Sequence, residues 1–128
     1  MRIEHTALYC RDLEGMKGFF VKYFRATPND MYHNPRTGLR TYIMTFPDGQ
    51  SRLELMTRPE VEGDNGSLYR AGFVHLSFAA GSREAVDSLT AALRADGYVT
   101  LDGPRTTGDG YYESCVRGFE GILLEITV

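Results

Sequence analysis

Two histidines occupy corresponding places in the chain, and a glutamate follows each at a matching distance. His5 and His75 lie 70 positions apart, each within an apolar segment. About 50 residues after each histidine comes a glutamate between two aliphatic residues, Glu54 in the first half and Glu125 in the second. Imidazole and carboxylate groups bind divalent transition metals and also serve as general acids and bases. We therefore interpret the chain as a tandem repeat in which each unit contributes one histidine and one glutamate.

Three of the four candidate side chains have an apolar residue on either side. Leu124 and Ile126 flank Glu125, and the same pattern surrounds Glu54 and His75. Successive side chains of a strand point to opposite faces, so we expect all four candidates on the sheet face turned away from the helices. Two carboxylates buried together without a cation would cost several kcal/mol, or one of them would become protonated. A divalent metal removes that penalty.

Two imidazoles with two carboxylates suit zinc, nickel, cobalt, manganese or iron. Taken singly, each residue also has a structural explanation, as a hydrogen-bonded strand histidine or a solvent-facing strand glutamate. Two such pairs at equivalent repeat positions favour the metal site. His33 is expected to be an exposed loop histidine, and Cys10 and Cys115 to be reduced core thiols without metal-type spacing.

The hydrophobic pattern places the elements that position these residues. Strands are expected at about 2–9, 41–46, 52–56, 73–79, 98–101, 111–117 and 122–127, with loops at 27–38 and 103–110. Asp12 and Ser82 are expected to cap two helices, with an apolar stripe at Val86, Leu89 and Leu93 in the second. The pattern predicts an α+β chain with unit 1 at 1–57, a linker at 58–71 and unit 2 at 72–128.

Length and composition narrow the class of protein. A chain of 128 residues is long enough for one sound core, which the two units are expected to share. The formal net charge of -3 offers no basic surface for a nucleic acid. The sequence contains no apolar run long enough for a membrane span and no leader-like segment. We expect a cytoplasmic protein that binds neither nucleic acid nor membrane.

Several motifs together resemble a known family over essentially the whole chain. They are Ile3-Glu4-His5-Thr6-Ala7-Leu8, Arg11-Asp12-Leu13 before a helix with Phe19-Phe20, Arg52-Leu53-Glu54-Leu55, Phe73-Val74-His75-Leu76, and Phe119-Glu120-Gly121-Ile122-Leu123-Leu124-Glu125-Ile126. The chain resembles the vicinal oxygen chelate superfamily of glyoxalases, bleomycin resistance proteins and extradiol dioxygenases. The resemblance implies tandem βαβββ units that form a cupped, barrel-like mixed sheet with helices outside.

The resemblance also implies a site. The family's metal ligands correspond to His5, Glu54, His75 and Glu125, and their order is similar to that of the bacterial glyoxalase I (lactoylglutathione lyase) branch. The expected reaction is proton abstraction next to a carbonyl in a thiol–aldehyde adduct, with Glu125 the first choice of base and Glu54 the second. The expected metal is Zn²⁺ or Ni²⁺, with Co²⁺, Mn²⁺ or Fe²⁺ also compatible. Glutathione use is left open, because Arg25-Ala26-Thr27-Pro28 replaces the usual glycine and basic residue after the first helix.

Other functions of the same superfamily stay open at this point. An extradiol dioxygenase or a thiol transferase typically has three protein ligands, and a bleomycin-resistance-type binding protein usually lacks the ligand set. Arg105, Tyr111 and Tyr112 are expected to contact the substrate, because their glycine-containing loop precedes a strand near Glu125. The expected partners are a small-molecule substrate, with a low-molecular-weight thiol, and a second copy of the chain in a homodimer. Its metal sites are expected to lie near the dimer interface or to be shared across it.

Overall fold

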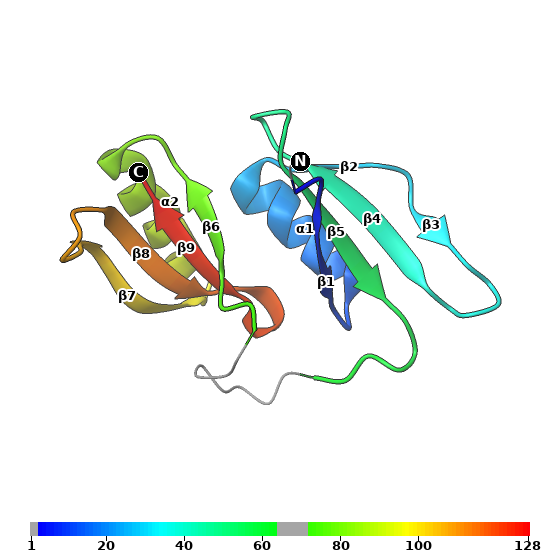
Figure 1. Cartoon of the computed structure of the whole chain (residues 1–128). Helices are drawn as coiled ribbons and strands as arrows, with labels where there is room; N and C mark the ends of the chain where they lie inside the picture. The colour runs from blue at the N-terminus through cyan, green and yellow to red at the C-terminus, as the bar shows by residue number, and fades with distance from the viewer. Residues whose placement is uncertain (1–2, 64–71) are drawn as a thin grey trace. The chain divides into compact units, whose positions relative to one another are not determined.

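A computed structural model describes residues 3–63 and 72–128 and divides the chain into two compact units, Met1–Gly63 and Asp64–Val128 (Figure 1). Each unit has one α-helix and its own mixed sheet, which confirms the predicted α+β class. Within each unit the sheet is curved and open, with two edge strands. The linker predicted at 58–71 lies partly outside the described residues.

In unit 1 the sheet order places the histidine strand beside the glutamate strand. The elements are β1 (Thr6–Tyr9), α1 (Leu13–Phe24), β2 (Thr27–Pro28), β3 (Tyr32–His33), β4 (Arg40–Thr45) and β5 (Arg52–Thr57). The sheet order is β1-β5-β4-β2, and β3 also pairs with β4. Strands β1 and β5 run parallel, and the connection of about 40 residues between them contains α1, β2, β3 and β4.

Helix α1 begins after an N-cap residue, Asp12, and ends at a C-cap residue, Arg25. The Asp12 side chain accepts a hydrogen bond from the Gly15 amide at 2.9 Å, as an N-cap should. Arg25 adopts a left-handed backbone conformation with φ of 54°, which ends the helix. The buried residues of the helix recur at intervals of three and four; they are Leu13, Met16, Phe19, Phe20 and Phe24. This stripe packs against β4 and β5 and covers one face of the sheet.

Unit 2 repeats the arrangement. The elements are β6 (Leu76–Ala79), α2 (Arg83–Ala95), β7 (Val99–Thr106), β8 (Tyr112–Arg117), a single 3₁₀ turn (Phe119–Gly121) and β9 (Leu123–Thr127), in the sheet order β6-β9-β8-β7. Ser82 caps α2 as predicted, accepting from the Ala85 amide at 3.1 Å. Val86 and Leu93 are buried as predicted, whereas Leu89 is only half-buried. Thr90 is the third buried residue, and its hydroxyl lies 2.6 Å from that of Ser114 on β8.

The observed strands differ from the predicted ones in three places. Strands β1 and β6 begin at Thr6 and Leu76, where their parallel pairing with β5 and β9 starts, so both histidines stand just before a strand. The segment 27–38, predicted as a loop, contains the short strands β2 and β3, because both pair with β4. The segment predicted as a loop from 103 belongs to β7 up to Thr106.

Strand β7 incorporates turn residues because it lies at an edge of its sheet. Pro104 has no amide hydrogen, and an edge strand tolerates that loss. The pairing with β8 shifts register between Thr100 and Asp102 and again between Asp102 and Arg105. These bulges accommodate Gly103, whose φ is 75°. Single-sequence reasoning took the glycine and proline as a loop signal, whereas the ladder to β8 continues past them.

Gly103→Ala is expected to destabilise unit 2 by about 2 to 4 kcal/mol. A Cβ atom at this position would clash with the backbone carbonyl oxygen of Glu113, and the positive φ disfavours any L side chain. Urea denaturation followed by circular dichroism measures the change. Gly108→Ala is the matched control, because nothing lies within 4 Å of its added Cβ. Equal stability of the two variants would show that β7 is not fixed at Gly103 as described.

Neither helix of the described residues is long and apolar enough to cross a membrane.

Candidate functional site: two histidine–glutamate pairs

In unit 1 the predicted histidine and glutamate lie side by side. The Nε2 atom of His5 is 3.7 Å from Oε2 of Glu54. Glu54 stands on β5 between Leu53 and Leu55, which are buried against α1, so its side chain lies on the sheet face away from the helix. The parallel pairing of β1 with β5, which sets Ala7 opposite Glu54, brings the preceding His5 within reach.

Unit 2 contains the equivalent pair with almost the same geometry. The Nε2 atom of His75 is 3.6 Å from Oε2 of Glu125. Glu125 stands on β9 between the fully buried Leu124 and Ile126, again on the face away from the helix. Parallel pairing of β6 with β9 sets Ser77 opposite Glu125. The tandem repeat that the sequence indicates is therefore present in atomic detail, as one histidine–glutamate pair in each unit.

The donor sets fit a divalent metal. Separations of 3.6 and 3.7 Å are too long for hydrogen bonds but close to the roughly 3.4 Å that separates two ligands bound at about 2.1 Å to one tetrahedral ion. The exposed fraction of the side chain is 21% for Glu54 and 23% for Glu125, so both side chains are partly buried. Within residues 3–63 and 72–128, neither carboxylate has a lysine or arginine partner.

The described residues contain no group of three or more His, Cys, Asp or Glu side chains placed to hold a metal. Each unit presents two donors, and the four predicted ligands appear as two equivalent pairs.

The surroundings of His5 fix the role of each ring nitrogen. Its Nδ1 atom donates to Oε2 of Glu4 at 2.5 Å, and Glu4 also pairs with Arg52. The other ring nitrogen, Nε2, faces Glu54. In metal-binding histidines, the ring nitrogen that does not bind the metal commonly donates a hydrogen bond to a carboxylate. This bond orients the ring and raises its basicity.

The surroundings of Glu125 fix the role of each carboxylate oxygen. The Ser77 hydroxyl donates to Oε1 at 2.7 Å, and Oε2 faces His75. On the other side, Cys115 of β8 stands opposite Glu125 in register. Burial, reinforced by the negative charge of Glu125, raises the pKa of the Cys115 thiol, and partial burial beside the same carboxylate raises the pKa of Glu113. The Cys115 thiol is therefore protonated at neutral pH and is a poor nucleophile.

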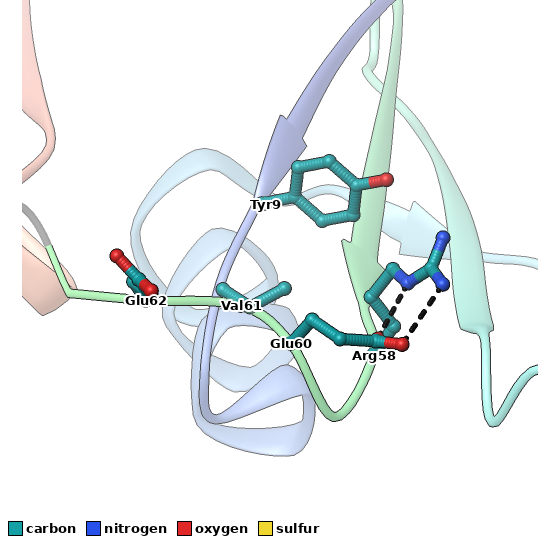
Figure 2. Close-up of a pocket in the computed structure, with 5 residues that line it drawn as sticks. All are labelled: Tyr9, Arg58, Glu60, Val61 and Glu62. Atoms are coloured by element: carbon teal, nitrogen blue, oxygen red, sulfur yellow. Dashed lines mark hydrogen bonds and ion pairs between the residues drawn. The ribbon is translucent and has the colours of Figure 1, made fainter.

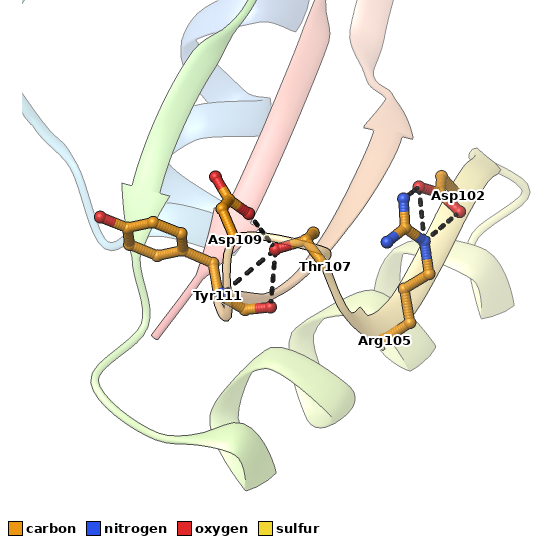
Figure 3. A network of polar contacts seen from close by, with 5 residues as sticks. All are labelled: Asp102, Arg105, Thr107, Asp109 and Tyr111. Carbon is orange, nitrogen blue, oxygen red and sulfur yellow. Dashed lines mark hydrogen bonds and ion pairs between the residues drawn. The ribbon is translucent and has the colours of Figure 1, made fainter.

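The predicted substrate loop of unit 2 is organised by its own polar contacts (Figure 3). Arg105 donates from Nε and Nη2 to the Asp102 carboxylate at 2.5 to 2.9 Å, which raises the pKa of Arg105 and lowers that of Asp102. This ion pair occupies one edge of the guanidinium, and the edge formed by Nη1 and Nη2 points elsewhere. The Thr107 hydroxyl accepts a hydrogen bond from the Tyr111 amide at 3.1 Å and holds the turn closed.

The two tyrosines of this loop lie in different environments. Tyr111 is exposed, with its ring beyond the turn (Figure 3). Tyr112 instead donates its hydroxyl to Asp87 of α2 at 2.7 Å, and the Arg83 guanidinium lies over its ring. Tyr112 is therefore on the helix side of the sheet, together with Ser114, and away from the face that carries Glu125.

A sequence model of the "Glyoxalase/Bleomycin resistance protein/Dioxygenase superfamily" matches residues 2–126. The chain belongs to this superfamily. No curated protein matches the chain. Solved structures with the same fold include a glyoxalase family protein from Bacillus cereus, 18% identical over 99% of this chain and 93% of that one, with a TM-score of 0.84.

Two further structures of this superfamily are similar. A glyoxalase/bleomycin resistance protein/dioxygenase domain from Frankia is 20% identical over 99% of this chain and 90% of that domain, with a TM-score of 0.81. The fosfomycin resistance protein FosX from Listeria monocytogenes, complexed with manganese(II) and sulfate, is 18% identical over 99% of this chain and 91% of its own, with a TM-score of 0.72. At these identities the likeness establishes the fold.

An open pocket of about 450 Å³ lies in unit 1, at the carboxyl ends of β1 and β5 (Figure 2). Its lining residues are Tyr9, Arg58, Glu60, Val61 and Glu62. Arg58 donates to Glu60 from Nε at 2.7 Å and from Nη2 at 3.1 Å, so its charge is neutralised locally. His5 and Glu54 do not line this pocket. The pocket is therefore separate from the His5–Glu54 pair.

Sequence reasoning missed Glu4 and Ser77. Glu4 directly precedes His5 in the sequence, and its carboxylate bonds to the ring of that histidine. Ser77 follows His75 by two residues and so lies on the same face of its strand, which is a signal that alternation alone could have supplied. His33 is exposed on β3, as predicted, although the segment is a short strand and not a loop.

Proposed function

We propose that this chain is a metal-dependent enzyme of the glyoxalase I type, which moves a proton next to a carbonyl in the adduct of an aldehyde and a low-molecular-weight thiol. One observation carries the proposal: two His–Glu pairs of nearly equal geometry lie at equivalent positions of the two units, and within the described residues neither carboxylate has a lysine or arginine partner. Two partly buried carboxylates are stabilised by a bound cation, and the imidazole beside each favours a transition metal as that cation.

In this proposal His5 and Glu54 of unit 1, and His75 and Glu125 of unit 2, are ligands of a divalent metal ion. Zinc or nickel is the first expectation, and cobalt, manganese or iron would accept the same donors. The manganese(II) in the FosX structure supports the use of a divalent metal on this fold. The bound ion would supply Lewis-acid stabilisation of the negative charge that develops on the substrate oxygen when the proton leaves.

The reaction needs a carboxylate that takes the proton from one carbon and returns it to its neighbour. Glu125 is the first candidate for this base and Glu54 the second, because each presents Oε2 on the open face of its sheet. As the proton leaves, the C–H electron pair becomes a carbon–carbon π bond and the carbonyl π pair moves onto its oxygen. The proton then adds to the former carbonyl carbon, while the hydroxyl proton passes to the neighbouring oxygen and the thioester carbonyl forms. The hemithioacetal becomes a thioester of equal composition, so no oxidant or reductant is consumed.

The loop of unit 2 supplies the proposed substrate contacts. The free edge of the Arg105 guanidinium is suited to a substrate carboxylate, and the exposed Tyr111 ring to an apolar portion. Because Tyr112 faces α2, it is not part of this proposed contact surface.

Arg105→Ala is expected to raise the Michaelis constant about tenfold and to leave turnover nearly unchanged, since it removes a charged contact made equally in the ground state and the transition state. Steady-state kinetics in metal-loaded protein measures both constants. Arg83→Ala removes an arginine on the helix side of the same sheet and should leave both unchanged. A fall in turnover with an unchanged Michaelis constant would contradict the assigned role of Arg105.

We also propose a homodimer, because each sheet has exposed edge strands that pairing of two copies could cover. A monomeric mass by light scattering, at high concentration and with metal bound, would overturn this part of the proposal.

The experiment that tests the function supplies methylglyoxal with glutathione, and separately with other low-molecular-weight thiols, to protein loaded with nickel or zinc. We expect thioester formation with at least one thiol and its loss on chelation. If metal binds but no thiol supports turnover, the glyoxalase activity is wrong, and the dioxygenase, thiol-transferase and binding functions of the superfamily become the alternatives.

A further inference from the structure

The two His–Glu pairs occupy equivalent positions, but a neighbouring side chain bonds to a different residue in each pair. In unit 1 the Glu4 carboxylate hydrogen-bonds to the histidine, and in unit 2 the Ser77 hydroxyl hydrogen-bonds to the glutamate. The repeat therefore breaks at the residues directly around the pairs, while the pairs themselves are nearly identical in geometry.

In unit 2 the support acts on the glutamate. Ser77 donates to Oε1 of Glu125 at 2.7 Å, which leaves Oε2 beside Nε2 of His75 at 3.6 Å. The hydroxyl therefore fixes which oxygen faces the imidazole and limits rotation of the carboxylate. The residue that precedes His75 is Val74, which has no group to bond its ring.

In unit 1 the support acts on the histidine. Glu4 accepts from Nδ1 of His5 at 2.5 Å and is itself paired with Arg52, a neighbour on β5 of Glu54. This contact requires a hydrogen on Nδ1 of the neutral ring, so Nε2 is left to donate its lone pair. Opposite Glu54, at the place of Ser77 in the repeat, stands Ala7, which offers no hydrogen bond.

We infer that Glu4 and Ser77 are positioning residues: Glu4 selects the His5 tautomer that exposes Nε2, and Ser77 fixes the Glu125 carboxylate with Oε2 toward Nε2 of His75. The inference rests on the proposed function. Groups behind a metal ligand orient it, and their loss commonly weakens metal binding by about 10- to 100-fold without removing a donor atom. The chain provides one such group in each unit, on opposite members of the pair.

The first test measures the zinc dissociation constant by competition with a chromophoric chelator. Ser77→Ala is expected to weaken binding about tenfold, and Ser77→Thr, which keeps the hydroxyl, to stay within about twofold of wild type. The equivalent substitution in the other unit, Ala7→Ser, is the matched control for a change at this position of the repeat. Unchanged affinity in Ser77→Ala, or equal losses in Ser77→Ala and Ser77→Thr, would overturn the Ser77 assignment.

The second test needs no metal. Nitrogen-15 NMR of the metal-free protein at about pH 8, where an ordinary imidazole is neutral, reports which ring nitrogen is protonated. We expect the proton of His5 on Nδ1 in wild type and on Nε2 in a large fraction of Glu4→Ala. His33 is an internal control that should not change. A wild-type His5 protonated on Nε2, or an unchanged tautomer in Glu4→Ala, would overturn the Glu4 assignment.

The two tests separate this inference from the proposed function. If wild-type protein binds no divalent metal, the proposed function fails and the Ser77 assignment fails with it, whereas the His5 tautomer still decides the role of Glu4. If the wild-type protein binds zinc, and Ser77→Ala and Glu4→Ala bind it equally well, only the positioning inference fails.

Discussion

His75→Ala and Glu125→Gln are each expected to weaken divalent-metal binding by more than about 100-fold, because loss of a ligand should exceed the effect of losing its supporting group. His75→Ala leaves an open coordination position. Glu125→Gln removes a negative charge, so the remaining ligands no longer neutralise the charge of the metal ion. Glyoxalase-type turnover should fall below detection in both. Zinc competition titrations and steady-state assays measure these effects, with circular dichroism to confirm that each variant is folded.

His33→Ala is the control for this prediction, since His33 is an exposed strand histidine outside both pairs. It should bind metal and turn over substrate as wild type does. Full metal content and activity in His75→Ala would show that the histidine–glutamate pairs are not the metal site.

Phe20→Ala is expected to lower the free energy of unfolding by about 3 to 5 kcal/mol, a large part of the stability of a small domain. Phe20 is fully buried on α1, and its ring meets those of Phe19, Phe24 and Phe46 at centroid distances of 5.5 to 6.3 Å. Its removal opens a cavity between the helix and the sheet that carries Glu54. Urea denaturation measures the loss, and metal binding should weaken only as far as unit 1 unfolds.

Val21→Ala is the neighbouring control, because Val21 is 42% exposed and points away from this cluster. It should change stability by no more than about 0.5 kcal/mol. Equal losses in the two variants would mean that α1 does not pack by the described face.

Local signals in the sequence predicted most of what positions the site. Asp12 and Ser82 cap their helices because short polar side chains satisfy the first free amides, an interaction that is complete within one turn. The alternation of polar and apolar residues along β5 and β9 predicted that Glu54 and Glu125 lie on the sheet face away from the helices. The burial of the leucine and isoleucine residues that flank them is consistent with that prediction. Such rules operate over three or four residues and therefore can be read without an alignment.

The features that escaped prediction depend on long-range pairing. Gly103 and Pro104 indicate a loop by themselves, but the ladder between β7 and β8 extends through them. Ser77 meets Glu125 only because β6 pairs in parallel with β9, 48 residues further along the chain. The Glu4 contact to His5 is local, yet adjacent residues of an extended segment are not expected to touch, so only the coordinates reveal it.

The metal content of the purified, reloaded wild-type protein tests the central claim most directly. Elemental analysis by mass spectrometry should find about one divalent ion per chain, because the account assigns four ligands per chain, the usual number for one ion. Two ions per chain would mean that each histidine–glutamate pair binds its own metal. Less than about 0.2 ion per chain after reloading would contradict the metal-dependent function itself, since the partly buried carboxylates would then be stable without a cation.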